Sequence, residues 1–305
     1  MSERTLRIIR IVVVVLNVMV AVVSSRRGDT SAMVIAIALA ALFLIQVIRP
    51  TFGSRSAEHD DRTPPELMSA VGDAPAHLLE VEGLSAWYER GRPVLTDVSF
   101  TLEVGEAVGL IGLNGAGKTT MLTSLCDVHR GARLGAPRYR GRDTCPGDER
   151  FKAARYLSLA DDSSFPTWNL EAFIGFLEQA YHLRPDRGRL EELIEGFDYG
   201  RYRITSFSRL SSGSRKKANL IAAFYLTTPL LFLDEPVDFL DFTATEFLYR
   251  SINDAAASGR SVLLSSHIAE SFTRCTRRLY VLSAGRMTGP FATPKDSDAV
   301  AALVG

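Results

Sequence analysis

The pattern of apolar and polar positions divides the chain into two unlike parts. In the first part, two nearly unbroken apolar runs, residues 6–23 and 31–48, are separated by the polar stretch SSRRGDT. Each run is close to the ~17–25 residues that a helix needs to cross the hydrocarbon of a bilayer. Neither run shows the polar stripe that a helix on the surface of a soluble protein keeps. The pattern predicts an α-helical transmembrane hairpin over residues 1–50.

Two other interpretations of the first part are open. Arg4, Arg7 and Arg10 lie at the start of the first apolar run, and a basic start followed by an apolar stretch is typical of a secretory signal peptide. A second apolar run follows at once, however, and cleavage would export the rest of the chain. The other interpretation is a buried hairpin of a soluble protein, but the helices of such a hairpin keep one polar face.

Arginines set the expected orientation of the hairpin. Two of them, Arg26 and Arg27, lie in the turn between the runs, and a larger group flanks the two ends. The flanking arginines are Arg4, Arg7, Arg10, Arg49, Arg55 and Arg62. Because positive side chains favour the cytoplasmic face of a membrane, both ends of the hairpin are expected in the cytoplasm. The chain is therefore expected in the cell membrane, with the lipid bilayer as one partner.

A different composition begins at Pro50. Residues 51–77 are rich in Pro, Gly, Ser and acidic residues and have no apolar period, which predicts a flexible linker. From Leu79, LEVEGL and then VSFTLEV (98–104) alternate apolar and polar residues, and period two predicts half-buried antiparallel strands. AVGLI, residues 107–111, is a continuous apolar run that suits a buried central strand. The following KTTMLTSLC favours a helix.

The segment between that strand and that helix, GLNGAGKTT, matches a phosphate-binding loop. Its pattern is Gly112-x-x-x-x-Gly117-Lys118-Thr119. Glycines let the main chain wrap closely around phosphate oxygens, and the helix that follows directs its positive end at them. Lys118 adds a charge near the β and γ phosphates of ATP, and the Thr119 hydroxyl is placed to bind Mg²⁺. The predicted ATP-binding residues here are Gly112, Asn114, Gly115, Ala116, Gly117, Lys118, Thr119 and Thr120.

A second motif, LLFLDEP at residues 230–236, is an apolar strand that ends in two acids. We expect Asp234 to hold Mg²⁺ and Glu235 to orient or deprotonate the attacking water, as phosphoryl transfer requires. An acidic strand end alone is an ordinary feature, but beside a phosphate-binding loop it predicts ATP hydrolysis. Because ATP is found inside cells, this part of the chain is expected to be cytoplasmic.

Two further stretches identify a family resemblance. LSSGS, residues 210–214, lies upstream of the acidic strand, and LLSSHIAE with His267 lies downstream. The order of these motifs from about residue 79 to residue 304 resembles the nucleotide-binding domain of ABC ATPases, most closely those of bacterial ABC-2-type exporters. The resemblance implies an α/β P-loop NTPase fold over residues 78–305, with a RecA-like core, an antiparallel β-subdomain and a helical subdomain.

The resemblance also implies roles for single residues. Ser211, Ser212 and Gly213 would cap the γ-phosphate that the opposite subunit binds, and they also fit an ordinary helix N-cap. Asp241 would be the D-loop acid, and His267 would be the switch residue that touches the γ-phosphate, unless it is a loop histidine of no special role. Tyr88 would stack on adenine, with Trp87 as the alternative in a shifted register and a plain core position as another.

The chain departs from the family at one loop. Members carry a glutamine in a loop after a strand, and the corresponding text here spans residues 153–170. Alignment on Tyr156 and Leu157 puts Leu159 at the position of that glutamine. Leucine cannot bind Mg²⁺, so Asp161 and Asp162 are the remaining candidates for that contact. Apolar residues at helical spacing over 169–199, interrupted near Pro185, predict two short helices. The resemblance implies that they form the helical subdomain, which docks on a permease in this family. The basic run Arg215, Lys216 and Lys217 is interpreted as a solvated helix face.

Composition narrows the possible partners. Lys+Arg and Asp+Glu number 35 each, so the formal net charge is zero, and no nucleic-acid partner is expected. The cysteines, Cys126, Cys145 and Cys275, are scattered, which argues against a disulfide framework or a zinc site and favours reduced thiols.

The function expected from the sequence is ATP binding and hydrolysis in an ABC transporter. One copy would supply the phosphate loop and Glu235 and a second copy would supply LSSGS, which implies a homodimer with ATP in its interface. A separate multi-span permease is expected, and export is the expected direction. The alternatives are a membrane-tethered ATPase that drives a regulatory or mechanical partner, and a weakly hydrolysing scaffold suggested by Leu159.

Overall fold

The computed structural model describes residues 77–162 and 164–304. The hairpin predicted at residues 1–50 and nearly all of the linker predicted at 51–77 lie outside these residues. Within the described part, none of the helices combines the length and the apolar character needed to cross a membrane.

The first of two sheets is antiparallel. Its long strands are β1 (Leu79–Glu89) and β2 (Arg92–Leu102), which pair with Leu79 opposite Leu102. Short strands complete it in the order β2-β1-β5-β6, with β4 also on β1. The short strands are β4 (Ala132–Arg133), β5 (Arg138–Tyr139) and β6 (Arg142–Asp143). The alternation of apolar and polar residues therefore predicted the two long strands correctly.

The second sheet has the strand order β11-β10-β3-β9-β8-β7. Its pairings are parallel except for β10 with β11. The strands are β3 (Ala107–Ile111), β7 (Arg155–Ser158), β8 (Leu230–Asp234), β9 (Ser261–Ser266), β10 (Arg278–Ser283) and β11 (Arg286–Ala292). All five residues of β3 are buried, as its apolar run predicts. The carboxyl ends of β3, β8 and β9 lie side by side, with Ile111 opposite Ser266 and Asp234 opposite Ser265.

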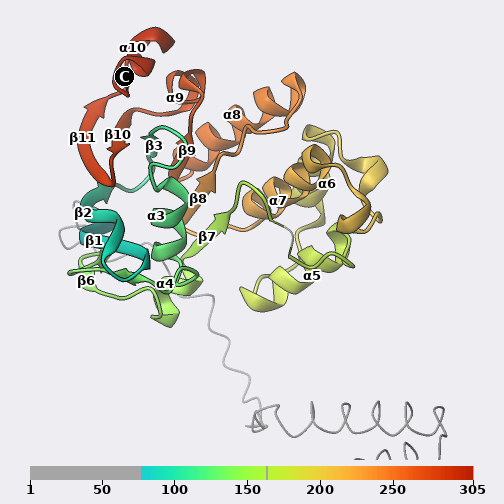
Figure 1. Ribbon diagram of the computed structural model, residues 1–305. Coiled ribbons are helices and arrows are strands. Elements are labelled where there is room, and N and C mark those ends of the chain that lie inside the picture. The colour runs from blue at the N-terminus through green and yellow to red at the C-terminus, as the bar shows by residue number, and fades with distance from the viewer. Residues whose placement is uncertain (1–76, 163, 305) are drawn as a thin grey trace, which may run out of the picture. The chain divides into compact units, whose positions relative to one another are not determined.

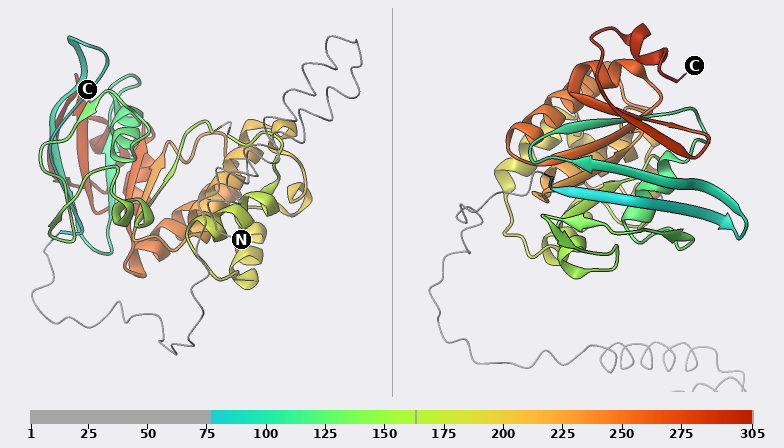
Figure 2. Two further views of the ribbon diagram at one scale, coloured as in Figure 1. Left: turned by 90° about the horizontal axis from the view of Figure 1, so that it is seen from below. Right: turned by 90° about the vertical axis from the view of Figure 1, so that its left-hand side faces the viewer.

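Two groups of helices complete the described part. Helix α3 (Lys118–Leu125) packs between the sheets, where Met121, Leu122 and Leu125 join their shared core. Helix α4 (Glu149–Ala153) adds Phe151 to the same core. Helices α8 (Phe242–Ala257), α9 (Ala269–Cys275) and α10 (Ser297–Ala301) contribute instead to a second core cluster. A separate group, α5 (Leu170–Ala180), α6 (Arg187–Gly196) and α7 (Ser212–Tyr225), lies on the side away from β1 and β2 (Figures 1 and 2). The 3-10 turns η1 (Gly200–Tyr202) and η2 (Phe207–Arg209) precede α7.

The helical group confirms the two short helices expected over 169–199. Both begin with a capping side chain: Asn169 accepts from Ala172 N and Asp186 accepts from Arg189 N. Such caps satisfy backbone N–H groups at the first turn. Pro185 lies between the helices, where its missing N–H costs no helical hydrogen bond.

Candidate functional site

The phosphate-binding loop runs from the end of β3 to the start of α3. Gly117 has φ 105°, a conformation that favours glycine. A Cβ at Gly117 would lie 2.7 Å from Leu95 Cδ2, and one at Gly112 would lie 2.4 Å from Leu282 O. Neither position therefore has room for a side chain. The next residues, Leu113, Asn114 and Gly115, are exposed, so the loop forms an accessible cradle with the amino end of α3 behind it.

Lys118 is buried at the base of this loop, with 6% of its surface exposed. Its Nζ donates to Gly112 O at 2.8 Å. The same Nζ forms an ion pair with Glu235 Oε1 at 3.1 Å. Two residues predicted from separate motifs, 117 positions apart in the sequence, therefore meet directly.

Asp234 connects three elements at the carboxyl edge of the sheet. Its side chain is fully buried. Thr119 Oγ1 donates to Asp234 Oδ2 at 2.8 Å, and Ser265 Oγ donates to Asp234 Oδ1 at 2.7 Å. The structure thus places the hydroxyl and the carboxylate predicted to bind Mg²⁺ against each other. Ser265 is a site residue that the sequence analysis missed, although it stands two positions before His267.

Glu235 follows Asp234 with φ 44°, an uncommon conformation for a residue other than glycine. Its backbone N–H donates to Ser265 O at 3.2 Å and to Ser265 Oγ at 3.1 Å. Its Oε2 accepts from His267 N at 3.1 Å and lies 2.9 Å from His267 Nδ1. Glu235 and His267, which the sequence analysis selected from separate motifs, are therefore in direct contact.

Asp238 is a neighbour of this pair that the sequence analysis did not select. Polar atoms of Glu235, Asp238 and His267 all lie within 4.8 Å of one another. Burial, followed by the negative charge of Glu235, raises the pKa of Asp238. Asp238 is three residues after Glu235, in the turn that follows β8. Its closeness to Glu235 in the sequence could have identified it as a candidate.

The LSSGS segment forms the start of α7. Ser211 is the N-cap residue, and its Oγ accepts from Ser214 N at 3.2 Å. Ser211 and Ser212 are exposed, and within the described chain no hydrogen bond joins them to the phosphate-binding loop. A Cβ at Gly213 would lie 2.5 Å from Phe239 O, so glycine is required there by the approach of the segment after Glu235.

Asp241 caps the next helix. Its Oδ1 accepts from Ala244 N at 2.9 Å at the start of α8, and its Oδ2 forms an ion pair with Lys217. The hydrogen bond from Lys217 lowers the pKa of Asp241. Asp241 therefore links the segment after Glu235 to α7.

The interpretation of the basic run as a solvated helix face was wrong for two of its residues. Lys216 and Lys217 are only 3% and 8% exposed. Lys217 is held by Asp241, and Lys216 donates to three main-chain carbonyls at the ends of β7 and β8. The two ammonium groups can be buried because oxygen atoms at the sheet edge accept their hydrogen bonds. Those oxygens come from distant parts of the sequence.

Tyr88 lies at the rim of the phosphate-binding loop. Its side chain is 71% exposed, its hydroxyl is 3.2 Å from Thr120 Oγ1, and its ring meets that of His129 edge-on at 4.7 Å. A plain core position for Tyr88 is therefore wrong. The alternative residue, Trp87, hydrogen-bonds through its backbone N–H to Gly131 O.

The described residues of the loop after β7 include Asp161 and Asp162, the two acids considered for the Mg²⁺ contact. Asp162 Oδ1 accepts from Ser164 N at 2.8 Å, and among the described residues neither Asp161 nor Asp162 hydrogen-bonds to Thr119 or Asp234. Instead, Leu159 O and Ala160 O accept from Lys216 at 3.2 and 3.1 Å.

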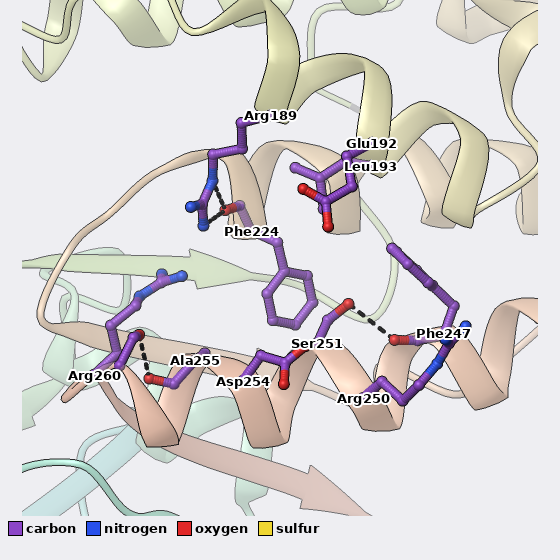
Figure 3. Close-up of a pocket in the computed structure, with 11 residues that line it drawn as sticks. Arg189, Glu192, Leu193, Phe224, Phe247, Arg250, Ser251, Asp254, Ala255 and Arg260 are labelled. Atoms are coloured by element: carbon purple, nitrogen blue, oxygen red, sulfur yellow. Dashed lines mark hydrogen bonds between the residues drawn. The ribbon is translucent and has the colours of Figure 1, made fainter.

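A cavity of about 330 Å³ lies elsewhere, between α6, α7 and α8. Figure 3 shows Arg189 of α6 above it and Arg260, Asp254 and Ser251 below it. None of the residues predicted to bind ATP lines this cavity. The candidate site is therefore the open loop and sheet edge, and not this cavity.

Comparisons with known proteins agree with this geometry. The family model described as ABC transporter matches residues 95–238. The ABC-type transporter ATP-binding protein EcsA of Bacillus subtilis is 32% identical over 216 residues, which cover 69% of this chain and 85% of EcsA.

Two other relatives are named for transport in opposite directions. The Nod factor export ATP-binding protein I of Rhizobium leguminosarum bv. viciae is 30% identical, covering 68% of this chain and 67% of its own. The hemin import ATP-binding protein HmuV of Pseudomonas aeruginosa is also 30% identical, and the match covers 68% of this chain and 84% of HmuV.

A solved structure shows the same fold. The protein titled "Structure of ATP binding subunit of ABC transporter" is 30% identical, with a TM-score of 0.63, and the match covers 70% of this chain and 90% of that one.

Proposed function

The chain belongs to the ATP-binding proteins of ABC transporters and is an ATPase, and from this premise we propose that a dimer of it powers export through a separate permease. The observation that supports the ATP-driven part of the proposal is the meeting of Lys118, Glu235 and His267 beside the pair Thr119 and Asp234. Three motifs far apart in the sequence thus form one edge where a triphosphate can be bound and cleaved.

The donor set at this edge fits Mg²⁺, which prefers hard oxygen ligands. Thr119 and Asp234 would hold the ion, whose charge would neutralise the phosphates during transfer. Lys118 would bind the terminal phosphates from the base of the cradle. Glu235 would accept the proton of the attacking water, with His267 holding the carboxylate in place.

The proposed dimer is supported by the exposed start of α7. Ser211 and Ser212 point to solvent at the amino end of a helix of 14 residues, where backbone N–H groups favour an anion. Phe239, whose carbonyl oxygen lies against Gly213, is 68% exposed, and Phe242, the first residue of α8, is 81% exposed. A second copy that places its nucleotide against Ser211–Gly213 would also cover these rings.

Glu235→Gln tests the split site. With hydrolysis blocked, ATP is expected to hold the variant as a dimer in light scattering, whereas the same variant without ATP stays monomeric. Lys118→Ala in the same background is expected to abolish both nucleotide binding and dimerisation. Lys152→Ala, an exposed lysine paired with Asp127, is the control and should dimerise normally. A Glu235→Gln variant that binds ATP and remains monomeric would contradict the split site.

The membrane partners form the second half of the proposal. The apolar runs in residues 1–50 support a transmembrane hairpin, and two spans per chain are too few for a permease of this family. An aromatic group at the start of the helical subdomain supports permease docking: Phe165 stacks on Trp168 at 4.3 Å and also meets Phe176, and both phenylalanines are exposed. Such rings favour contact with another protein.

Gentle detergent extraction and identification of the co-purified protein test this half. A multi-span membrane protein would support transport, and a peptidoglycan enzyme or a kinase would favour a membrane-tethered ATPase with a regulatory or mechanical partner. The Phe165→Ala/Phe176→Ala double variant is expected to lose the partner. ATP binding by the isolated variant should be unchanged, because neither ring contacts the phosphate-binding loop.

A further inference from the structure

Lys216 lies at the junction of the sheet edge and the helical subdomain. It comes from the second turn of α7, the helix that Ser211 caps. Its Nζ donates to Leu159 O at 3.2 Å, to Ala160 O at 3.1 Å and to Asp234 O at 3.1 Å. An ammonium group has three N–H donors, so each of them has a main-chain acceptor.

These acceptors belong to neighbouring strands. Leu159 and Ala160 directly follow β7, and Asp234 is the last residue of β8, which pairs with β7 in parallel. The charged groups around the ammonium are Asp161, Asp234, Glu235 and Asp238. Burial lowers the pKa of Lys216 to about 8, against the opposing effect of these acids. A buried lysine is costly unless its donors are satisfied, and here they are.

The hydrogen bond from Lys216 to Asp234 O holds the peptide group that joins Asp234 to Glu235. The N–H of that unit donates to Ser265 O and Ser265 Oγ, and its carbonyl accepts from Lys216. Both ends of one peptide are therefore fixed, immediately before a residue at φ 44°. A strained backbone conformation persists only where surrounding contacts hold it. Rotation of this peptide would move the Glu235 carboxylate away from Lys118 and His267.

We propose that Lys216 is a positioning residue for ATP hydrolysis, which holds the Asp234–Glu235 peptide to α7 and to the loop after β7. Movement of α7 relative to the parallel sheet would then pull directly on the peptide that aims Glu235. Because α7 also carries Ser211 and packs against α5 and α6, the lysine gives the helical subdomain a mechanical link to the catalytic carboxylate. This inference rests on the proposed ATPase site and adds a route by which a partner regulates it.

The test compares K216M, K216R and K152M in the full-length protein. K216M removes the three donors and keeps the length of the side chain. We expect its kcat to fall about tenfold or more, while the Kd for a fluorescent ATP analogue stays within about threefold of wild type, since a contact used only in the transition state changes kcat alone. K216R keeps charged donors and should recover kcat to within about threefold of wild type. K152M changes an exposed lysine on α4 and should match wild type.

The outcomes separate this inference from the proposed function. If wild type hydrolyses ATP and K216M has the same kcat, or if K216R binds ATP normally but is as slow as K216M, the positioning role is wrong. If K216M does not fold, K216Q replaces it in the test, because the side-chain amide of glutamine cannot donate to all three carbonyls. A normal kcat for K216Q would also contradict the positioning role of Lys216. A wild-type protein without ATPase activity would instead overturn the proposed function.

Discussion

At the scale of single residues, the Glu235 carboxylate has a different partner on each oxygen. Oε1 faces Lys118 Nζ, and Oε2 receives the backbone N–H of His267 and lies next to its Nδ1. Lys118 and Asp234 each have further partners in the same network. The arrangement therefore ties Lys118 and His267 to one carboxylate, which we propose to be the catalytic group.

Replacement of His267 by alanine tests the imidazole contact. His267→Ala keeps the backbone N–H but removes Nδ1, so we expect kcat for ATP hydrolysis to fall by about 10- to 100-fold. The Kd for ATP should change much less, since Lys118 and the loop glycines remain. His182→Ala, at an exposed position after α5, is the control for loss of an imidazole. A His267→Ala variant with wild-type kcat would show that the backbone contact is sufficient.

The cysteines give a second prediction at this scale. Burial raises the pKa of Cys126 to about 11 and that of Cys275 to about 12, whereas Cys145 is exposed. At pH 8 only about a thousandth of Cys126 is thiolate, the reactive form. Iodoacetamide followed by peptide mass spectrometry should therefore find Cys145 modified first and the others only after denaturation. Comparable labelling of Cys126 in the folded protein would contradict its protected environment.

Local patterns identified most of these residues but not the ones that depend on tertiary contacts. The phosphate loop and LLFLDEP are contiguous, so their residues could be selected directly. Ser265 and Lys216 could not, because their role is to contact Asp234 across 31 and 18 positions of sequence. The prediction that Lys216 is exposed was wrong for the same reason. A run of basic residues does not indicate that main-chain carbonyls at the ends of two strands accept hydrogen bonds from one of them.

At the scale of elements, hydrophobic periodicity predicted β1, β2, β3 and α3 and the pair α5 and α6. The strand order could not be predicted, since β3 pairs with β9 and β10, whose sequences lie more than 140 residues later. Parallel neighbours bring their carboxyl ends together. That order brings the scattered motifs together at one edge of the sheet, where we propose that ATP is cleaved.

Two helical glycines give a matched test of packing between elements. A Cβ at Gly196, the last residue of α6, would lie 2.0 Å from Phe247 Cζ of α8, whereas one at Gly175 of α5 would meet nothing within 4 Å. Gly196→Ala should lower the free energy of unfolding by about 1–3 kcal/mol through overpacking. Gly175→Ala should raise it by about 0.5–1 kcal/mol, because alanine restricts the unfolded chain. Urea denaturation of both variants measures the difference, and equal effects of the same sign would contradict the close contact of α6 and α8.

At the scale of the whole molecule, we assign membrane anchoring and the ATP site to different parts of the chain. The residues that form the catalytic edge all lie between positions 112 and 267, and their contacts are internal to the described part. Residues 1–50 carry the apolar runs on which the proposed membrane anchoring rests.

Deletion of residues 1–50 tests this division. The shortened chain should move from the membrane fraction to the soluble fraction, because the removed runs are the segments long and apolar enough to hold it in a bilayer. Nucleotide-dependent dimerisation of its Glu235→Gln form should persist, since the proposed dimer contacts are Ser211–Gly213 and the phosphate loop. Fractionation beside the full-length protein, in cells with and without the co-purified partner, measures the first effect. If the shortened chain stays in the membrane fraction only when the partner is present, the partner is the anchor; if it stays there without the partner, membrane attachment resides in residues 51–305.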